Sequence, residues 1–348
     1  MRIFVTIFLL LLFTSSAVYA HGECCLSRSL VEATTSNITT ASNFGVSLQY
    51  EYTNMKTIRD GTNSISHNTV LDDVAAKWPV MSMEDKSFAI PTRMIMQKYT
   101  VLGTYSATER LQFLATVPYV INDMYMRQLR RSAMGMDMTM DMQMDTVEGL
   151  GDMTLMGLYK LYMDNPDVPT KKLTFGIGLK PPTGKNDEET ASGTLVHAMM
   201  QPGTGSWDPL FLVNYMHTFS PVVFQTNLLY HVTTEGDEGY EFGDKVSLDL
   251  IARYPLTNYV SPGIELNGLY AGQDTDHDGK YSRPDESLLD NPDNTGIISL
   301  AVSPSVQVKI PKTGGSVNLK FQKPIYQNVR GTQQVADWSA MASVVWAF

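Results

Sequence analysis

The chain closes on residues 337–348, DWSAMASVVWAF. In an extended strand, successive side chains point to opposite faces. Every second residue from Trp338 to Phe348 then lies on one face, which is apolar throughout and carries aromatic side chains near both ends. Such a face is typical of a transmembrane β-strand, whose outer side meets lipid and whose ends lie at the aromatic girdles. Because a lone strand in lipid would leave its backbone groups unpaired, the stretch predicts a closed barrel.

Eleven earlier stretches alternate in the same way and supply the other strands of such a barrel. In the first of them, Val46, Leu48 and Tyr50 share one face, while Ser47 and Gln49 lie on the other. The stretches are residues 46–52, 92–105, 111–119, 151–162, 173–180, 210–219, 222–232, 245–253, 264–270, 298–310 and 316–325. With the C-terminal strand, the sequence predicts a barrel of twelve strands.

The lengths of the connections support this interpretation. Long connections follow the odd-numbered strands, at residues 55–91, 122–149, 181–209, 233–244, 272–296 and 326–336. Short ones follow the even-numbered strands, at residues 106–110, 164–172, 220–221, 255–262 and 311–315. A barrel with short periplasmic turns, long external loops and both termini in the periplasm requires this parity. We therefore predict an all-β fold, a transmembrane antiparallel β-barrel, over residues 45–348.

The N-terminus predicts export. Arg2, an apolar stretch at residues 3–13 and a small-residue cleavage site ending at Ala20 indicate a signal peptide over residues 1–20. The apolar stretch is too short for a membrane-spanning helix, which needs about 20 residues. Residues 21–44 then form an N-terminal periplasmic segment with adjacent cysteines, and Glu23 before them departs from a lipobox. The signal peptide and the barrel together predict that the protein is located in the outer membrane of a Gram-negative bacterium.

Charge and motif content narrow the functional classes. The formal net charge of the 348 residues is −10, which gives no support to nucleic-acid binding. No Gly-x-Ser-x-Gly spacing appears, and His217 and His231 fall near opposite ends of adjacent predicted strands, so we expect no enzyme and no required cofactor. The expected partners are outer-membrane lipid, the barrel-assembly machinery through the C-terminal strand, and a small-molecule or metal solute. The alternatives to a channel are a structural or adhesin-like barrel and an outer-membrane enzyme.

Charged residues occupy inward positions of the predicted strands. They are Glu51, Lys180, Lys245, Asp249, Arg253, Glu265, Lys309 and Lys320. Both signs occur. Two interpretations follow, because such groups either line a water-filled lumen or pair across it and plug it.

Four stretches resemble motifs of a known family. Residues 149–159, GLGDMTLMGLY, are similar to its GLGDLTL strand, and residues 176–185, GIGLKPPTGK, to its GLKLPTGK corner. Residues 201–208, QPGTGSWD, and 324–331, PIYQNVRG, are similar to its PGTGSWD loop entry and its PVYQNLNG turn. The family is the outer-membrane transporter group named after the meta-pathway of phenol degradation. The resemblance implies an outer-membrane β-barrel that passes small molecules, with no catalytic residues to carry over.

One predicted external loop fits the start of a calcium site. Carboxylates at the first, third and fifth positions, a glycine at the sixth and a polar residue at the ninth can surround a hard cation with oxygen. The candidate ligands are Asp274, Asp276, Asp278, Ser282 and Asp285. The twelfth position holds Asp285 rather than the usual glutamate, so closure of the loop is weaker. The alternative is a solvated acidic loop without a metal.

A second loop predicts a soft-metal site. Methionines alternate with Gly, Asp, Thr and Gln, so an extended conformation puts six thioethers on one face: Met134, Met136, Met138, Met140, Met142 and Met144. Thioethers suit Cu(I), and Ag(I) shares that preference. The alternative is a strand extension whose flexible apolar face packs on other loops. His21, which begins the mature chain, and the nearby Cys24 and Cys25 are further metal-ligand candidates.

Overall fold

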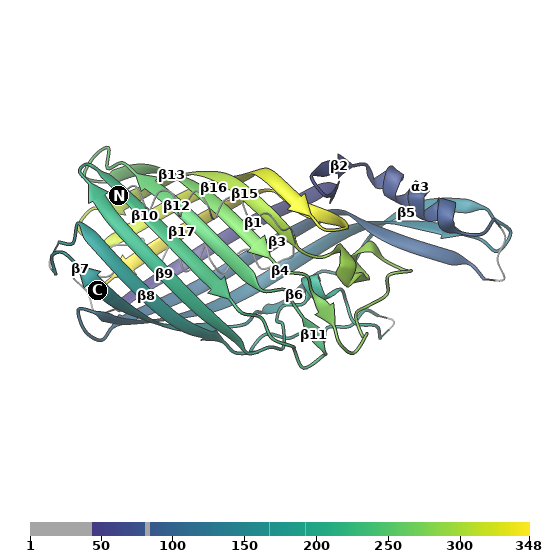
Figure 1. The fold of residues 1–348 in the computed structure, drawn as a ribbon, viewed down its shortest axis with the longest axis horizontal. Coiled ribbons are helices and arrows are strands. Elements are labelled where there is room, and N and C mark those ends of the chain that lie inside the picture. The colour runs from purple at the N-terminus through teal and green to yellow at the C-terminus, as the bar shows by residue number, and fades with distance from the viewer. Residues whose placement is uncertain (1–43, 81–83, 167, 192) are drawn as a thin grey trace, which may run out of the picture.

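A computed structural model describes residues 44–80, 84–166, 168–191 and 193–348. Twelve antiparallel strands make the barrel (Figure 1): β1 (Phe44–Asp60), β3 (Lys86–Ser106), β4 (Leu111–Arg131), β7 (Thr154–Met163), β8 (Lys171–Lys180), β9 (Asp208–Phe219), β10 (Val222–His231), β12 (Lys245–Arg253), β13 (Val260–Ala271), β15 (Ile297–Ile310), β16 (Gly315–Val329) and β17 (Thr332–Ala347). Each predicted strand has its counterpart, so the fold prediction is confirmed. The predicted cleavage site, His21, Cys24 and Cys25 lie outside the described residues.

The C-terminal strand closes the barrel, as its sequence predicts. β17 pairs with β1 along both strands, from Gly45 opposite Ala347 to Asp60 opposite Thr332. At the periplasmic end of this pairing, Phe44 and Phe348 exchange backbone hydrogen bonds of 3.1 and 3.0 Å. The closed ring leaves no open strand edge in lipid, which is the condition for a barrel to span a membrane.

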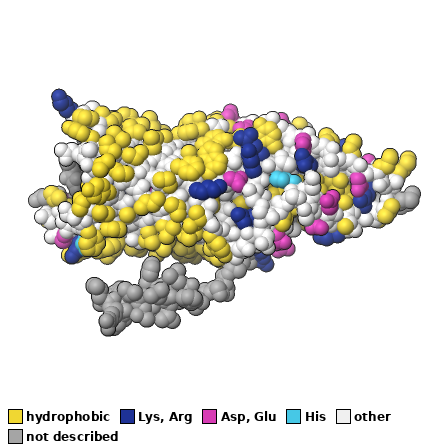
Figure 2. Space-filling view, turned by 90° about the horizontal axis from the view of Figure 1, so that it is seen from above, with side chains coloured by type: hydrophobic (Ala, Val, Ile, Leu, Met, Phe, Trp, Pro, Cys, Tyr) yellow, Lys and Arg dark blue, Asp and Glu magenta, His cyan; other side chains and the backbone are white. Residues whose placement is uncertain are grey.

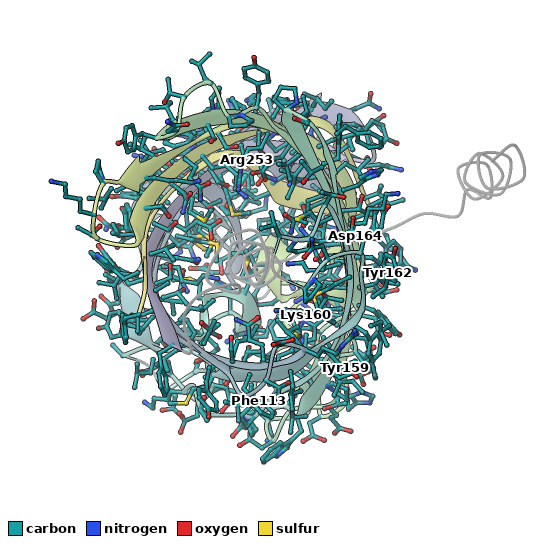
Figure 3. All side chains as sticks on the ribbon, turned by 90° about the vertical axis from the view of Figure 1, so that its left-hand side faces the viewer. Phe113, Tyr159, Lys160, Tyr162, Asp164 and Arg253 are labelled. Atoms are coloured by element: carbon teal, nitrogen blue, oxygen red, sulfur yellow. The ribbon has the colours of Figure 1, made fainter. Side chains whose placement is uncertain are left out.

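The two faces of the wall differ as the alternation predicts. On β17, Ser339, Met341, Ser343 and Val345 are buried inside, and the alternate positions face outward. Phe113, Tyr159 and Tyr162 point away from the barrel, whereas Lys160 and Arg253 point into it (Figure 3). Hydrophobic side chains cover the barrel half of the molecule, and charged ones gather over the other half (Figure 2). None of the described helices has the length and apolar character needed to cross a bilayer.

The prediction of a long last external loop is wrong. Residues 326–336 were expected to be a long connection, but β16 and β17 extend to Val329 and Thr332 and are joined only by Arg330 and Gly331. The segment is polar because it lies beyond the lipid, where a strand needs no apolar outer face. Its glutamines Gln327, Gln333 and Gln334 are buried. Polarity alone therefore does not distinguish a loop from a strand that continues past the membrane.

The first two external connections also carry regular structure. The external ends of β3 and β4 extend as a pair beyond the barrel (Figure 1), and the same two connections contain β2 (Asn63–Ile65), α3 (His67–Lys77), β5 (Asp137–Gln143) and β6 (Val147–Leu150). Ser66 caps α3, since its Oγ accepts a 3.0 Å hydrogen bond from the Thr69 N–H. Val70 and Leu71 are the buried residues of α3, and they pack into an apolar cluster with Leu129 of β4.

The other external loops fold over the mouth of the barrel. They contain η2 (Ala198–Met200), β11 (Tyr240–Glu241), β14 (Thr275–Asp276), η3 (Leu288–Asp290) and η4 (Pro292–Asn294). β11 pairs with β14, which joins the loop after β10 to the loop after β13. His197, next to η2, bonds through Nδ1 to Asp290 Oδ1 of η3, and Arg283 Nε lies 2.9 Å from the other oxygen of that carboxylate. These contacts tie three loops into one cap.

Candidate functional site

The lumen has a wall that contains an apolar cluster and a wall that is mostly polar, and buried polar side chains such as Thr116 and Asn214 also lie on the strands of the first wall. The apolar wall is a buried cluster from β3, β4, β7, β9 and β10: Leu102, Leu114, Met156, Leu158, Leu210, Leu212 and Leu229. The polar wall includes buried side chains of β12, β13, β15, β16, β17 and β1: Ser247, Asp249, Glu265, Asn267, Ser303, Asn318, Lys320, Ser343, Gln49 and Glu51. A solute in the lumen would meet both kinds of surface.

Most of the predicted inward charges are inside. Glu51, Lys180, Lys245, Asp249, Glu265 and Lys320 are buried, and Arg253 points inward, whereas Lys309 is exposed at the periplasmic end. Lys320 Nζ lies 3.0 Å from Glu265 Oε2, and Arg253 Nη2 lies 3.9 Å from Glu265 Oε1. At these positions the structure shows the cross-pairing that the sequence left as one of two alternatives.

A buried ionic cluster lies at the external end of the lumen. Lys180 Nζ is 2.8 Å from Asp152 Oδ2 and 2.9 Å from Asp208 Oδ2. Asp208 Oδ2 also bonds to His231 Nε2 at 3.0 Å, and the Thr204 N–H and hydroxyl donate to Asp152 Oδ2. Buried charges need partners of this kind, because water is not available to solvate them. His217 packs against the Phe219 ring at the other end of β9, so the two histidines do not share a site.

Three of the four family-like motifs converge on this cluster. The motif at 149–159 supplies Asp152, the motif at 176–185 supplies Lys180, and the motif at 201–208 supplies Thr204 and Asp208. The glycines of these motifs let the backbones meet. A Cβ on Gly203 would lie 2.4 Å from the Gly184 carbonyl carbon. The motifs therefore act as one structural unit that anchors two external loops to the barrel.

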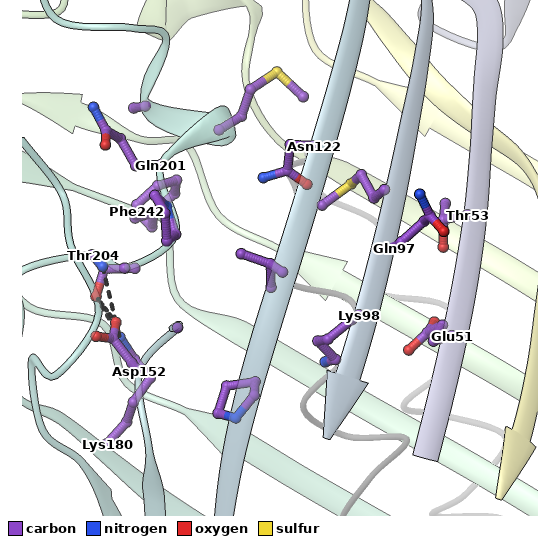
Figure 4. Close-up of a pocket in the computed structure, with 18 residues that line it drawn as sticks. Glu51, Thr53, Gln97, Lys98, Asn122, Asp152, Lys180, Gln201, Thr204 and Phe242 are labelled. Atoms are coloured by element: carbon purple, nitrogen blue, oxygen red, sulfur yellow. Dashed lines mark hydrogen bonds and ion pairs between the residues drawn. The ribbon is translucent and has the colours of Figure 1, made fainter. Parts of the chain in front are cut away.

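A small cavity lies between the cap and the wall. Its volume is about 100 Å³, and its lining includes Glu51, Met96, Asn122, Asp152 and Met199 (Figure 4). The lining combines carboxylates, an amide and thioethers. Such a mixture can hold a small polar or soft ligand.

The predicted calcium ligands are engaged with the protein itself. Asp274 accepts from the Tyr240 hydroxyl at 2.8 Å and from the Gly243 N–H at 2.9 Å. Asp276 accepts from the N–H groups of Gly279, Tyr281 and Ser282, as the first carboxylate of a tight turn does. Asp278 lies 3.6 Å from Lys280, and Asp285 is exposed. Burial raises the pKa of Tyr240 well above its usual value, so this partner of Asp274 stays a neutral donor.

The methionine-rich loop is only partly extended. β5 spans Asp137–Gln143, so Met138, Met140 and Met142 share one face. Met134 and Met136 lie in an exposed turn, which Gly135 makes with a positive φ of 83°, and Met144 packs inside. The six thioethers therefore do not form one face as expected, because the turn interrupts the strand.

The other face of β5 is held by arginines. Arg131 Nε lies 2.6 Å from Asp137, and Arg127 Nε lies 2.7 Å from Asp141. Hydrogen bonds from these guanidinium groups hold the pKa of both carboxyl groups below their usual values. The two aspartates are therefore ionised but paired, so they offer less attraction to a free cation than unpaired carboxylates would.

A buried methionine cluster was missed by the sequence analysis. Its buried members are Met55, Met94, Met124, Met126, Val147, Val196, Met199 and Met200, and Met96 and Met144 pack against it. The alternation Met94-x-Met96 and Met124-x-Met126 was the available signal. The cluster lies under the cap, where β1, β3 and β4 meet the loop that carries η2. In the described part of the chain, no three His, Cys, Asp or Glu side chains converge as a metal site.

Comparisons with known proteins agree with the barrel. Residues 97–336 match the model of the family described as the MetA-pathway of phenol degradation. An outer membrane channel from Pseudomonas putida F1 is similar at 12% identity and a TM-score of 0.54, over 89% of this chain and 98% of that chain.

Two further solved structures are more distant. They are the P. putida toluene transporter TodX, at 10% identity and a TM-score of 0.46, and a P. aeruginosa FadL homologue, at 8% and 0.43. The TodX match covers 90% of this chain and 93% of TodX, and the FadL-homologue match covers 89% of this chain and 92% of that homologue. No curated protein matches the sequence. At these identities the likeness to the P. putida F1 channel supports the fold alone.

Proposed function

The chain belongs to the family of the MetA-pathway of phenol degradation, and from that premise we propose that it is an outer-membrane channel for small solutes. The observation that carries the proposal is the lumen, in which the leucine-rich wall of β3, β4, β7, β9 and β10 faces a wall of amide, hydroxyl and charged side chains. A small hydrophobic or aromatic compound with one polar group can contact both walls.

Planar-bilayer conductance of the refolded protein tests the channel. Stepwise conductance in simple salt should appear, and a small phenol should reduce it by occupying the lumen, whereas a sugar of similar size should not. Conductance at the level of the bare bilayer, with no uptake of phenol into vesicles, would identify a structural or adhesin-like barrel. Chemical conversion of the phenol by the same preparation would identify an enzyme.

A second candidate function is external capture of Cu(I) or Ag(I). Its support is the exposed thioether face of Met138, Met140 and Met142, which projects beyond the barrel on β5. Because Asp137 and Asp141 on the opposite face are paired with arginines, affinity for a soft cation would come from sulfur rather than from charge. Thioethers also do not titrate in the ordinary pH range, so this affinity should persist at mildly acidic pH.

Silver retention by the full-length protein tests the capture. Cys24→Ser and Cys25→Ser are introduced first, because thiolates bind silver strongly. Replacing the five exposed methionines Met134, Met136, Met138, Met140 and Met142 by Leu should lower the amount of Ag(I) retained. Asp137→Asn with Asp141→Asn is the matched control and should retain as much as the parent. Equal retention by the leucine variant would contradict capture and leave the channel proposal in place.

A further inference from the structure

We propose that the buried methionines under the cap form a second binding site, for a soft monovalent cation such as Cu(I) or Ag(I). The site consists of Met55, Met94, Met124, Met126, Met199 and Met200. The inference rests on the capture proposed above only for the route by which the cation arrives. Binding at the site stands by itself and is tested separately.

Strand register brings three of these methionines together. Met55 of β1 is the direct cross-strand partner of Met94 of β3, and Met94 is the partner of Met124 of β4. Directly opposed residues of an antiparallel pair share a face and have Cβ atoms about 5 Å apart. All three side chains are buried. The wall thus presents a row of three thioethers, at a spacing that flexible methionine side chains can close around one ion.

The cap supplies further thioethers from the opposite side. Met199 and Met200 of η2 belong to the same cluster. The Asn122 side chain fixes this loop against β4, because its Nδ2 donates a 3.0 Å hydrogen bond to the Met200 carbonyl. Two to four sulfur ligands from the wall and from the cap are the kind of environment that soft thioethers offer to Cu(I).

Packing alone does not account for methionine at these positions. Six of the eight buried residues of this cluster are methionines, whereas the leucine-rich wall of the same lumen contains one, Met156. Leucine and methionine have similar volumes and replace each other at small cost in cores. Inward positions on β3 and β4 carry leucine at Leu102 and Leu114 but methionine near the cap. What differs between the two clusters is the sulfur.

The buried cluster is continuous with the exposed face of β5. Met142 of β5 is the cross-strand partner of Met126 of β4, so both side chains lie on the same face of the sheet. Met144 follows, and its N–H donates a 2.9 Å hydrogen bond to the Met124 carbonyl. Thioethers thus run from the exposed Met138 to the buried Met94 without a break in register. A cation can pass along this row by exchange of one sulfur ligand for the next.

The site adjoins open space. Met96 and Met199 line the cavity of about 100 Å³ described above, together with Asn122. Asn122 Oδ1 is buried and has no hydrogen-bond partner within the described part of the chain. A buried acceptor of this kind calls for a partner from solvent or a ligand. The cavity therefore has room for an ion with a water, and an oxygen that can hold that water.

The experiment uses the full-length protein with Cys24→Ser and Cys25→Ser, refolded in detergent, and Ag(I) as a redox-stable probe. The exterior variant carries Met134, Met136, Met138, Met140 and Met142 as Leu. The combined variant adds Met55→Leu, Met94→Leu and Met124→Leu. After gel filtration, the exterior variant should still retain silver, and the combined variant should lose that remaining fraction. Met156→Leu in the exterior variant is the matched control, because it removes a buried methionine from the leucine-rich wall, and it should change nothing.

Heat-modifiable migration on gels reports whether the combined variant folds. If it does not fold, a second measurement tests the site in the exterior variant. X-ray absorption of the silver-loaded exterior variant should then show sulfur neighbours. Oxygen and nitrogen neighbours alone would overturn the site, as would silver retention that is equal in the folded combined and exterior variants. Retention by the exterior variant at the level of the parent would refute external capture but support the buried site. Binding of toluene without retained silver would assign the cluster to apolar solutes and overturn the inference.

Discussion

Lys180 Nζ lies 2.8 Å from Asp152 Oδ2, although the two residues are 28 positions apart in the chain. Their side chains are only 3% and 2% exposed. Asp208, 2.9 Å from the same ammonium group, is 1% exposed. Two carboxylates that the fold removes from water therefore share one cation, and His231 provides a further partner for the second. The stability of the external end of the barrel depends on these contacts between the buried carboxylates and their cationic and hydrogen-bonding partners.

Replacing Lys180 by Met should destabilise the barrel by about 3–5 kcal/mol, because it leaves Asp152 and Asp208 buried without their shared counter-ion. Urea unfolding in detergent, followed by heat-modifiable migration, measures the change. Lys185→Met is the matched control. It alters a lysine of the same motif whose side chain is 56% exposed, and it should have little effect. Equal stability of the two variants would show that the buried cluster does not support the fold.

Gly203→Ala should also destabilise the barrel, since the added Cβ would lie 2.4 Å from the Gly184 carbonyl carbon. Backbone atoms cannot yield as a flexible side chain does, so we expect a cost of about 1–3 kcal/mol. The same unfolding measurement applies. Gly103→Ala is the control, because its Cβ would have nothing within 4 Å. A stable Gly203→Ala variant would mean that the two loops separate more easily than the structure indicates.

The strands were predictable from the sequence because the membrane imposes a pattern on single strands. Stretches such as 46–52 and 245–253 alternate since one face meets lipid. Beyond the lipid this constraint ends, so the strand ends at Val329 and Thr332 and the helix α3 were not found. The buried charge cluster could have been anticipated in part, as Asp152, Lys180 and Asp208 stand within the glycine-rich motifs.

The buried methionine cluster could not be predicted in the same way. Met55, Met94 and Met124 come from three strands, and their meeting depends on register. Register is set by pairing between strands and by bulges, such as the shift next to Met55, which a single sequence does not reveal. The alternating run from Met134 to Met144 was visible because it is local. Its interruption at Gly135 was not, since glycine adopts positive and negative φ with similar ease and the sequence does not tell which one it takes.

Asp164 gives a prediction for pH dependence in a periplasmic turn. The Thr170 hydroxyl and the N–H groups of Thr170 and Lys171 donate to its carboxylate, and they lower its pKa from 3.8 to about 2. Because the pKa is lower in the folded state, the contribution to stability is present above pH 3.8 and is lost as the pH falls through about 2. Wild type should therefore be more stable than Asp164→Asn at neutral pH.

Measuring both proteins over a range of pH separates the effect of the ionised carboxylate from other effects of the substitution. The difference in urea midpoint between wild type and Asp164→Asn should be constant from pH 7 to about pH 5 and should shrink towards pH 2. A difference that grows on acidification would contradict the assignment of these hydrogen bonds to the ionised carboxylate.

Removing Phe348 should impair assembly of the barrel. Its N–H donates to the Phe44 carbonyl at 3.0 Å, and its carbonyl accepts from the Phe44 N–H at 3.1 Å, so the residue completes the closing pair of strands. Recovery in the outer-membrane fraction measures the effect. Phe348→Tyr keeps both backbone bonds and an aromatic ring, and it should assemble normally. Normal recovery of the truncated protein would show that closure does not need this last pair.

Calcium binding by the loop from Asp274 to Asp285 is the remaining prediction, and the structure sharpens its test. Asp276 accepts three backbone hydrogen bonds, so Asp276→Ala would remove a turn cap as well as a candidate ligand. Asp285 is exposed and occupies the position that would close a calcium loop. Calorimetry of the whole protein should show calcium binding that is lost in Asp276→Ala and weakened in Asp285→Ala. If wild type and Asp285→Ala give equal heats while Asp276→Ala alone changes, the loop is held by its own hydrogen bonds and Asp285 is not a ligand. If none of the three proteins takes up calcium, Asp274 and Asp276 serve only to join the cap.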